Sequence, residues 1–536
     1  MKYPSIVRQA VFAVSGSLLV AMLAILMLAI GAAAAENYDE PYRPQFHFTP
    51  AKNWTNDPNG PIFYQGEYHL FYQHNPFGNE WGHMSWGHAV SRDLVHWQHL
   101  PLALAEENGI MIFSGSTVVD WHNSSGLCTG SAADPSCLIA IYTGYTGTQQ
   151  FQNLAYSNDK GRTWTKYAGN PILDLHLKDF RDPKVFWHEA THKWIMVTAL
   201  SPEHKLRFWG STDLKHWTAL SDFGPAGADG GVWECPDLFE LPVQGEPGQA
   251  RWVLDVNLNP GGFAGGSGDQ YFIGQFDGTT FTNENAKELT LWSDYGKDFY
   301  ASTSFSDIPK SDGRRMWLGW LVNWQYAGKT PTSPWRGLQS IPRDLKLRRT
   351  ADGIRLLQEP VAELHTLRGQ HTSLTGQSIG AVNRALQARH VHGETLEIEA
   401  EIETGGASEV GLKVRQGPEE ETLIGVDMGG SAGVDKGIRK KEAKLFVDRT
   451  HSGNVSFDGK FPGRHAGPLR WAEGKPVKLH LFVDGSSVEV FANDGETVIS
   501  DEIFPAGSSQ GVEFYSHGGR ARIVKLDVWN LQSAWK

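Results

Sequence analysis

The sequence predicts an all-β protein in two parts, a β-propeller followed by a β-sandwich. From about residue 50 to 350 the chain is made of short apolar or alternating runs separated by Gly, Pro, Asn and Asp, and no long run of apolar residues has helical spacing. Within this region a degenerate repeat recurs every ~50–70 residues, which fits one four-stranded blade per repeat. Later strands alternate cleanly with period two, as is typical of an antiparallel sandwich.

The repeat is clearest in two copies. Residues 91–97 read Ser-Arg-Asp-Leu-Val-His-Trp, and residues 211–217 read Ser-Thr-Asp-Leu-Lys-His-Trp. Residues 157–164 are a looser third copy and residues 275–281 a distant fourth. We interpret these segments as structural turns in the outer strands of blades, because the ligand site of a propeller lies at its axis.

The change of pattern sets the domain boundaries. We predict a propeller over residues 36–350, a linker over 351–368 with room for a short helix, and a sandwich over 369–536. A hairpin is expected early in the propeller, where residues 61–64 and 68–72 flank Gln-Gly-Glu. Strands of the sandwich are expected at residues 395–403, 410–414, 423–428, 444–448, 477–483, 487–492, 497–503 and 523–529.

The bulk composition excludes some classes of partner. The 536 residues carry 48 basic and 60 acidic side chains, a formal charge of −12, so no basic field attracts nucleic acid or an anionic membrane. The chain also has 20 Trp and 15 Tyr. Aromatic rings in a weakly charged chain are suited to stacking on sugars, although packing in a core is their commoner use.

Residues 1–35 are predicted to be a secretory signal. Lys2 and Arg8 precede an almost wholly apolar run over residues 11–30, and Ala-Ala-Ala stands directly before Glu36. The apolar run is also long enough to span a bilayer, so an uncleaved anchor is the alternative. We therefore expect an exported protein, extracellular or periplasmic, with no membrane contact once the signal is cleaved.

Three cysteines fit an oxidising compartment. Cys128 and Cys137 close a short loop rich in Gly, Ser, Ala and Pro and can form a disulfide outside the cytosol, which would leave Cys235 free. The sequence has no CxxC motif and no His pair with ligand spacing, so we expect no metal site. No organic cofactor is implied either.

The chemistry is expected at three carboxylates in similar turns. Asp57 lies in Trp-Thr-Asn-Asp-Pro-Asn-Gly (residues 54–60), Asp182 in Phe-Arg-Asp-Pro (180–183) and Glu234 in Trp-Glu-Cys-Pro-Asp (233–237). One such turn alone would most simply be a side chain that caps its own loop. Three of them fit glycoside cleavage, in which one carboxylate attacks or stabilises the anomeric carbon and another acid protonates the leaving oxygen.

These three motifs, in this order, resemble the signature motifs of glycoside hydrolase family 32, which includes invertases, inulinases and levanases. Further similar segments are residues 113–116, 296–301, 323–327, 333–337 and 488–495. The resemblance implies a propeller of five blades before the sandwich and a retaining mechanism. It assigns Asp57 as the nucleophile at C2 of a β-fructofuranosyl unit, Glu234 as the acid and base, and Asp182 as the group that binds fructose hydroxyls and stabilises the transition state.

The resemblance also implies which residues bind the substrate and what that substrate is. We expect a secreted exo-acting β-fructosidase that removes terminal fructose from levan or inulin, and also acts on sucrose. The alternatives are an invertase acting mainly on sucrose, a fructosyltransferase, and a fructan-binding protein without catalysis. The residues nominated for the fructose subsite are Asn56, Gln73, Trp81, Phe113, Ser114, Arg181 and Trp335.

Overall fold

A computed structural model describes residues 38–131, 133–429, 434–435, 438–439, 443–472 and 474–535. The predicted signal segment, residues 1–35, lies outside the described residues. Residues from Glu40 onward form one compact unit, which is built almost entirely from strands. The single α-helix in the described ranges is α2 (Ile379–Ala388), and no helix there has the length and apolar character that crossing a bilayer requires.

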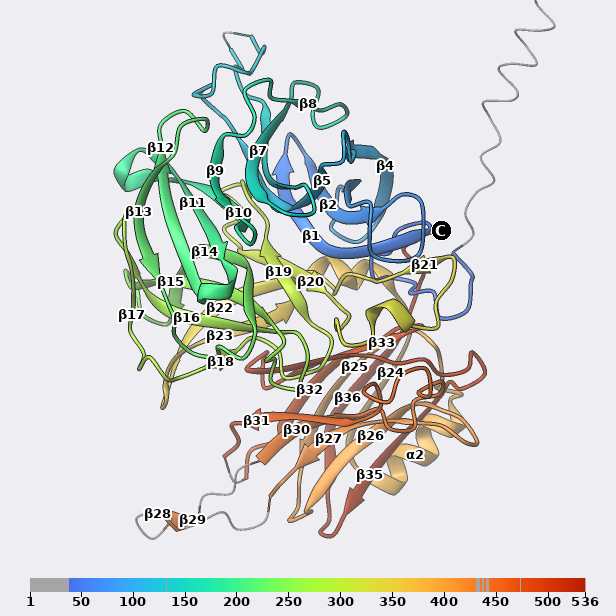
Figure 1. The fold of residues 1–536 in the computed structure, drawn as a ribbon. Coiled ribbons are helices and arrows are strands. Elements are labelled where there is room, and N and C mark those ends of the chain that lie inside the picture. The colour runs from blue at the N-terminus through green and yellow to red at the C-terminus, as the bar shows by residue number, and fades with distance from the viewer. Residues whose placement is uncertain are drawn as a thin grey trace, which may run out of the picture. The chain divides into compact units, whose positions relative to one another are not determined.

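The first part of this unit is a succession of antiparallel meanders (Figure 1). Many neighbouring strands within the meanders are joined by short turns, whereas residues 120–137 and residues 321–342 form longer connections. The first sheet contains β1 (Asn53–Tyr64), β2 (Glu67–Asn75), β3 (Ser85–Ser91) and β4 (Trp97–Leu104), with β21 (Trp335–Arg336) parallel to β1. The second contains β5 (Met111–Val119), β6 (Leu138–Tyr145), β7 (Gln150–Ser157), β8 (Thr165–Lys166) and β9 (Leu173–Leu177).

The next three meanders follow the same plan. The third contains β10 (Arg181–His188), β11 (Lys193–Leu200), β12 (Lys205–Ser211) and β13 (Thr218–Phe223). The fourth contains β14 (Val232–Gln244), β15 (Ala250–Asn259), β16 (Gly268–Phe276), β17 (Phe281–Asn283) and β18 (Leu291–Trp292). The fifth contains β19 (Tyr300–Ser304), β20 (Met316–Trp320), β22 (Arg343–Thr350) and β23 (Gly353–Pro360), and joins the fourth where β14 pairs with β22. Short 3₁₀ helices are η1 (Glu189–Thr191), η2 (Ser201–Glu203), η3 (Ala327–Lys329) and η4 (Ala362–Leu367).

The first strands of the five meanders form a closed ring. β1 contacts β5, β5 contacts β10, β10 contacts β14, β14 contacts β19, and β19 returns to β1. Radial sheets around such a ring are a β-propeller. The predicted propeller is therefore confirmed, and in the described part of the chain the ring has five members.

The repeated Ser-Asp…Trp segments are turns between outer strands, as predicted. Asp93 accepts backbone hydrogen bonds from Val95 and His96, and the Trp97 indole donates to the Leu94 carbonyl. The same bonds recur around Asp213 with Trp217. These segments connect β3 to β4 and β12 to β13, away from the ring of inner strands.

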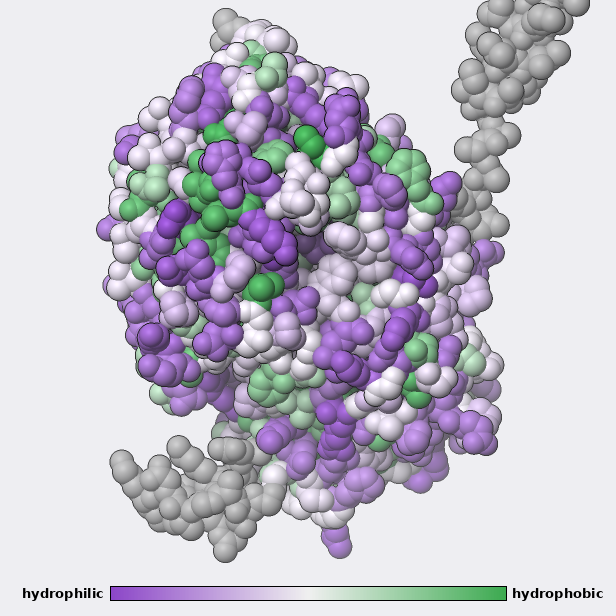
Figure 2. Space-filling view, viewed as in Figure 1, coloured by the Kyte–Doolittle hydropathy of each residue, from purple (hydrophilic) through white to green (hydrophobic). Residues whose placement is uncertain are grey.

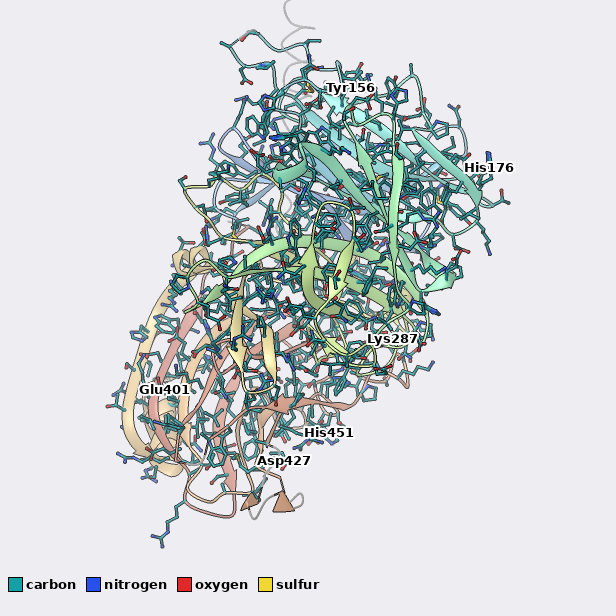
Figure 3. All side chains as sticks on the ribbon, turned by 90° about the vertical axis from the view of Figure 1, so that its left-hand side faces the viewer. Tyr156, His176, Lys287, Glu401, Asp427 and His451 are labelled. Atoms are coloured by element: carbon teal, nitrogen blue, oxygen red, sulfur yellow. A yellow bond between two sulfur atoms is a disulfide. The ribbon has the colours of Figure 1, made fainter. Side chains whose placement is uncertain are left out.

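The second part is the predicted antiparallel sandwich. One sheet has the order β24 (Arg368–Ser378), β36 (Arg522–Leu531), β25 (Leu396–Glu403), β32 (Val477–Val483), β33 (Ser487–Ala492) and β34 (Thr497–Glu502). The other has the order β31 (Arg464–Leu469), β30 (Ala443–Asp448), β27 (Thr422–Asp427), β26 (Glu409–Gln416) and β35 (Gly511–His517), and β28 (Val434–Asp435) pairs with β29 (Ile438–Arg439) separately. Alternating Val, Leu and Ile residues from both sheets fill the space between them. Figure 3 shows the side chains on the ribbon, with Glu401 and Asp427 among the labelled residues of the sandwich.

The segment expected as a linker differs from that expectation. Residues 353–360 are β23, which pairs with β22 from end to end, so they extend the fifth sheet of the propeller. The reason is the turn at Gly353, whose φ of 109° lets the chain reverse, and the apolar side chains of Ile354 and Leu356, which are buried against β22. Only residues 361–367, mostly η4, connect the two parts.

Buried ion pairs join the propeller to the sandwich. His47, at the start of the propeller, contacts Asp484 at 2.8 Å and Glu489 at 2.9 Å, and all three side chains are inaccessible to solvent. Arg343 on β22 donates to Glu489 and, at 3.2 Å, to Asp294. Because a buried charge is costly without its partner, these contacts fix how the two parts pack.

The face of the molecule shown in Figure 2 is mostly hydrophilic with scattered apolar patches.

Candidate active site

The inner strands of all five blades are irregular at one end. Each has a register shift with its neighbour, and these shifts fall between Thr55 and Pro58, Ile112 and Gly115, Arg181 and Lys184, Glu234 and Asp237, and Tyr300 and Thr303. A bulge of this kind bends the strand and redirects a side chain. The shifted segments contain the three predicted carboxylates, so the bulges bring the three motifs to one end of the ring.

Backbone strain accompanies the bulges. Asp182, Cys235 and Ala301 have φ values of 60°, 45° and 53°, a region that residues other than Gly seldom occupy. Such conformations persist where the surrounding structure holds them, typically at functional sites. The Pro after Asp57, Asp182 and Cys235 has no N–H to donate, and a bulge is one of the few places within a sheet that tolerates it.

Asp57 is buried, and hydrogen bonds from Ser114 and Asn56 hold its carboxylate. Ser114 donates its hydroxyl to Oδ2 at 2.6 Å, and Asn56 donates its amide to Oδ1 at 2.9 Å. Asn56 is itself fixed by the indole of Trp54, which donates to its oxygen at 2.7 Å. Burial raises the pKa of Asp57, while the hydrogen bonds from Ser114 and Asn56 oppose that rise by stabilising the anion.

Asp182 lies beside the same cluster. The backbone N–H of Cys235 donates to its Oδ2 at 2.9 Å, and Arg181 Nε lies 3.8 Å from that oxygen. Burial raises the pKa of Asp182 to about 7, despite the opposing charge of Arg181 and with a further contribution from Glu234. The pKa of the two buried aspartates is therefore raised for the same main reason, loss of water.

Glu234 receives hydrogen bonds on both oxygens. Arg181 donates to Oε1 from Nε at 3.2 Å and from Nη2 at 3.1 Å, and the buried hydroxyl of Tyr300 donates to Oε2. Arg181 is held in turn by Asp179 at 3.0 Å. A carboxyl group gripped from both sides has a fixed direction, which a group that exchanges protons with a substrate requires.

The free thiol of Cys235 lies between the carboxylates. Its Sγ is 3.5 Å from Oδ2 of Asp57 and 3.7 Å from Oδ2 of Asp182. Burial, followed by the charges of the surrounding carboxylates, raises the pKa of this thiol well above its usual value. Cys235 is therefore a neutral thiol that acts as a weak donor to the carboxyl groups of Asp57 and Asp182. The other two cysteines, Cys128 and Cys137, form a disulfide.

Of the predicted binding residues, Asn56, Ser114 and Arg181 contact the carboxylates directly. Gln73 is buried, and its amide nitrogen has no hydrogen-bond partner. Trp81 is 45% exposed and packs edge-on against Phe113, with ring centroids 6.0 Å apart. Since a buried donor without a partner is costly, the Gln73 amide is suited to a ligand or water oxygen.

Trp335 is a fully buried member of the predicted binding set. Its side chain is 0% exposed, and the guanidinium of Arg43 lies 4.8 Å from the centre of its ring. Trp335 belongs to β21, which pairs in parallel with the inner strand β1. An indole with no accessible face cannot stack on a sugar, but its Nε1, like the amide nitrogen of Gln73, is buried without a hydrogen-bond partner, so a binding role for Trp335 stays a prediction. Trp324 is a better candidate for stacking, since it is only partly buried and stacks on Trp54 with centroids 5.9 Å apart.

Sequence reasoning missed other contacts at the site. Tyr300 belongs to a segment that the resemblance included, but nothing in the sequence indicated that its hydroxyl meets Glu234. Asn257 accepts from the Ala301 N–H at 2.8 Å and donates to the Cys235 carbonyl at 3.2 Å, and so ties two bulges together. Its position near the end of β15 gave no signal.

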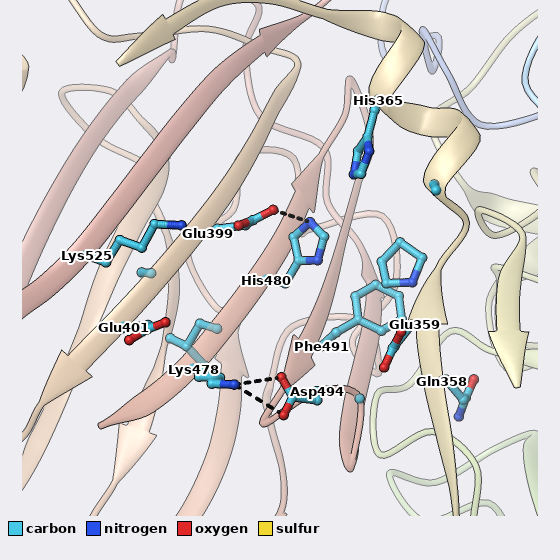
Figure 4. A pocket seen from close by; sticks show the side chains of 15 residues that line it. Gln358, Glu359, His365, Glu399, Glu401, Lys478, His480, Phe491, Asp494 and Lys525 are labelled. Atoms are coloured by element: carbon cyan, nitrogen blue, oxygen red, sulfur yellow. Dashed lines mark hydrogen bonds and ion pairs between the residues drawn. The ribbon is translucent and has the colours of Figure 1, made fainter. Parts of the chain in front are cut away.

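A second polar cluster lies in the sandwich. Among the described residues Glu397, Glu399 and His480 are the group whose ligand atoms could surround a metal ion, and Figure 4 shows His480 facing Glu399. Arg368 already donates to Glu397 at 2.7 and 2.6 Å and to Glu399 at 3.0 Å. Because Arg368 already bonds to oxygens of both carboxylates and His480 contacts Glu397 at 2.8 Å, we assign the cluster a structural role.

Comparison with known proteins identifies the family. The family model described as "Glycosyl hydrolases family 32 N-terminal domain" matches residues 47–360, and "Glycosyl hydrolases family 32 C terminal" matches residues 363–530. The chain belongs to glycosyl hydrolase family 32. As a member of this family it is a glycoside hydrolase, and the family comparison fits the retaining mechanism.

Individual relatives of family 32 match most of the chain. A levanase of Bacillus subtilis is 51% identical over 518 residues, which cover 95% of this chain and 74% of the relative. An extracellular exo-inulinase of Aspergillus ficuum is 40% identical over 541 residues, covering 94% and 97%. The crystal structure of an exo-inulinase from Aspergillus awamori has a TM-score of 0.83 and 38% identity, covering 93% of this chain and all of that one.

Proposed function

We propose that this family 32 protein is a retaining β-fructofuranosidase that releases terminal fructose from levan or inulin and also cleaves sucrose. The observation that carries the proposal is the pairing of two differently held carboxyl groups, Asp57 and Glu234, around one thiol and one buried aspartate. Relatives named levanase and exo-inulinase, at 51% and 40% identity, support fructan as the substrate class.

In the first step we assign the nucleophile to Asp57. Its carboxylate attacks C2 of the fructofuranosyl unit while the bond from C2 to the leaving oxygen breaks, and Glu234 gives its proton to that oxygen. The Ser114 hydroxyl and the Asn56 amide hold the attacking carboxylate in one orientation. The product of this step is a fructosyl-enzyme and the shortened sugar.

In the second step Glu234 takes a proton from water. The resulting hydroxide attacks C2, the ester bond to Asp57 breaks, and fructose leaves with its anomeric configuration retained. Arg181 and Tyr300, which hold the two oxygens of Glu234, keep this group within reach of both the leaving oxygen and the water. Asp182 is assigned to the fructose hydroxyls, and the Gln73 amide and the Trp81 and Trp324 rings to the rest of the subsite.

The proposal includes export of the protein. The disulfide between Cys128 and Cys137 supports an oxidising compartment, and the exo-inulinase relative is named as extracellular. The predicted signal at residues 1–35 agrees with this proposal. Mass spectrometry of the secreted protein would show whether the chain begins near Glu36.

A timed product profile on levan, inulin and sucrose tests the activity. Fructose as the first and sole product from either polymer is the expected result. A mixture of oligosaccharides would mean endo-cleavage, growth of chains at high sucrose would mean transfer, and activity on sucrose alone would mean an invertase. The matched variants Asp57→Asn and Glu234→Gln should lose at least ~10³-fold in kcat, because each removes one of the two reacting groups. If both variants retained full activity, the assignment of these residues would fail.

A further inference from the structure

A second cavity lies at the opposite end of the propeller ring. It has a volume of about 860 Å³ and is lined by the late residues of the inner strands and the segments that follow them. Val118 on β5, Phe186 on β10 and Leu238 on β14 contribute to it, whereas Ser114, Asp182 and Glu234 lie earlier on the same strands. Phe186 is four steps along the strand from Asp182, which corresponds to about 13 Å.

A buried ion pair separates this rear cavity from the active site. Lys184 lies on β10 between the two, and its ammonium group is 3.0 Å from Asp237 and donates to the Ser304 carbonyl at 2.7 Å. Both charged side chains are almost completely buried. The axial space beside the catalytic residues, which Lys184 also lines, is only about 20 Å³. A ligand in the rear cavity therefore cannot reach Asp57 or Glu234.

The rear cavity presents rigid aromatic rings. Trp121 is 48% exposed, and its indole N–H donates to Asp307 at 2.8 Å. Trp187 is 38% exposed, donates to Glu189 at 2.8 Å, and packs edge-on against Trp194 with centroids 5.2 Å apart. The hydrogen bonds fix the direction of both indoles while leaving their faces accessible. Rings held in this way lose little conformational entropy when a ligand stacks on them.

The polar lining indicates a neutral ligand. Four carboxylates and three cations line the cavity, so charges of both signs surround it with no large excess of either: Asp120, Glu189, Glu240 and Asp307 against Lys184, Lys310 and Arg315. An anionic or cationic ligand would gain little from this lining, whereas hydroxyl groups can donate to the carboxylates and accept from the cations. The combination of flat apolar faces with donors and acceptors at their edges is the chemistry that recognises sugars. The volume lies within the range of ligand pockets and leaves room for a short oligosaccharide.

We infer that the rear cavity is an accessory binding site for a segment of the fructan substrate, with Trp121 and Trp187 as its stacking platforms. This inference rests on the proposed function, because it takes the polymer that the active site would cleave as the ligand. Two binding sites on one molecule raise the effective concentration of a long chain at the active site. Sucrose is too short to contact both, so the accessory site affects polymers alone.

Affinity electrophoresis tests the inference. Asp57→Asn protein, which holds polymer without cleaving it, is run through native gels containing levan, inulin or dextran. We expect levan or inulin to retard it, and the added substitutions Trp121→Ala and Trp187→Ala to weaken the retardation at least ~3-fold. Trp187→Phe keeps a flat ring and should keep the retardation. The control Leu102→Ala, an exposed apolar residue on the outer strand β4, should leave it unchanged.

Kinetic measurements on the active enzyme show whether the two substitutions weaken polymer binding or disturb folding. They also test the proposed function separately. The Trp121→Ala/Trp187→Ala enzyme should show an unchanged kcat/KM on sucrose and a ~3- to 10-fold higher KM on levan or inulin. Retardation by fructan equal to that of the parent would overturn the inference, as would equal retardation by dextran. If the unmodified enzyme released no fructose from any of the three substrates, the proposed function would fail instead.

Discussion

The hydroxyl of Ser114 lies 2.6 Å from Oδ2 of Asp57 and donates a hydrogen bond to that oxygen. Ser114 comes from the bulge of β5 and Asp57 from the bulge of β1, so the contact exists only because the two inner strands are distorted at the same level. The bond stabilises the ionised form of Asp57 and opposes the effect of burial on its pKa. Loss of this hydrogen bond should therefore affect catalysis.

Replacing Ser114 by Ala should slow the enzyme and shift its pH profile. A hydrogen bond to a charged group contributes roughly 1.5–3 kcal/mol, so kcat/KM should fall about 10- to 150-fold. Without the bond the pKa of Asp57 rises further, and the acidic limb of the profile of kcat/KM should move to higher pH. Ser221→Ala, which removes a hydroxyl bonded to the Thr279 carbonyl, is the control and should change neither quantity. An unshifted acidic limb in Ser114→Ala would contradict the prediction.

Replacing Arg181 by Lys should reduce kcat/KM at least ~100-fold while the fold is retained. Arg181 holds Oε1 of Glu234 through two nitrogens and Asp179 through a third, and a single ammonium group cannot make that set of contacts. Arg207, which binds Asp222 through two nitrogens at 2.7 and 2.9 Å, is the matched control. Arg207→Lys should change kcat/KM by no more than about twofold, because the ion pair between Arg207 and Asp222 lies on β12 and β13, far from the active site. Steady-state kinetics and melting temperatures of both variants provide the test, and equal losses of activity would refute it.

Replacing Asp182 by Asn should stabilise the protein at neutral and alkaline pH while removing activity. Burial raises the pKa of Asp182 to about 7, so the folded state holds this proton more tightly than the unfolded chain does. The resulting stabilisation is fully present below pH ~3.8 and is lost as the pH rises through about 7. An amide carries no charge at any of these values. We therefore expect the melting temperature of Asp182→Asn to exceed that of the parent at pH 8, and the difference to vanish near pH 4. A difference independent of pH would count against this account.

The contact of His47 with the sandwich should make the unfolding free energy depend on pH in the neutral to alkaline range. Burial alone would lower the pKa of His47, but hydrogen bonds to Asp484 and Glu489 raise it to about 9. Its contribution to stability is therefore complete below pH ~6.5 and is lost as the pH rises through about 9. The unfolding free energy of the parent should decline over this interval. His47→Gln should be less stable at pH 6 and should lack that part of the decline, which urea unfolding at pH 6, 8 and 9.5 would measure. The control His176→Gln, at an exposed position on β9, should keep the full decline.

Much of the site could be predicted from short stretches of sequence. Asp57, Asp182 and Glu234 belong to short motifs with Pro and, for Asp57, Gly, which restrict φ or allow unusual values of it. The sequence predicted turns at these motifs, whereas the structure has bulges of β1, β10 and β14. The all-β character and the two parts of the chain also follow from local alternation and turn residues. The linker was placed wrongly at residues 351–368 because pairing of β23 with β22 depends on a neighbouring strand that the local pattern does not reveal.

Local sequence therefore sets the chemistry of the reacting groups and the places where the chain turns. Which of these groups meet depends on the packing of the strands. The bulges of five strands far apart in sequence place Ser114 on Asp57 and Tyr300 on Glu234, and the pairing of β21 with β1 buries Trp335 while Trp324 stays partly exposed. The physical reason is that strand propensity and turn chemistry act between neighbours in the chain. Contacts around the axis depend instead on closure of the ring, which no single segment encodes.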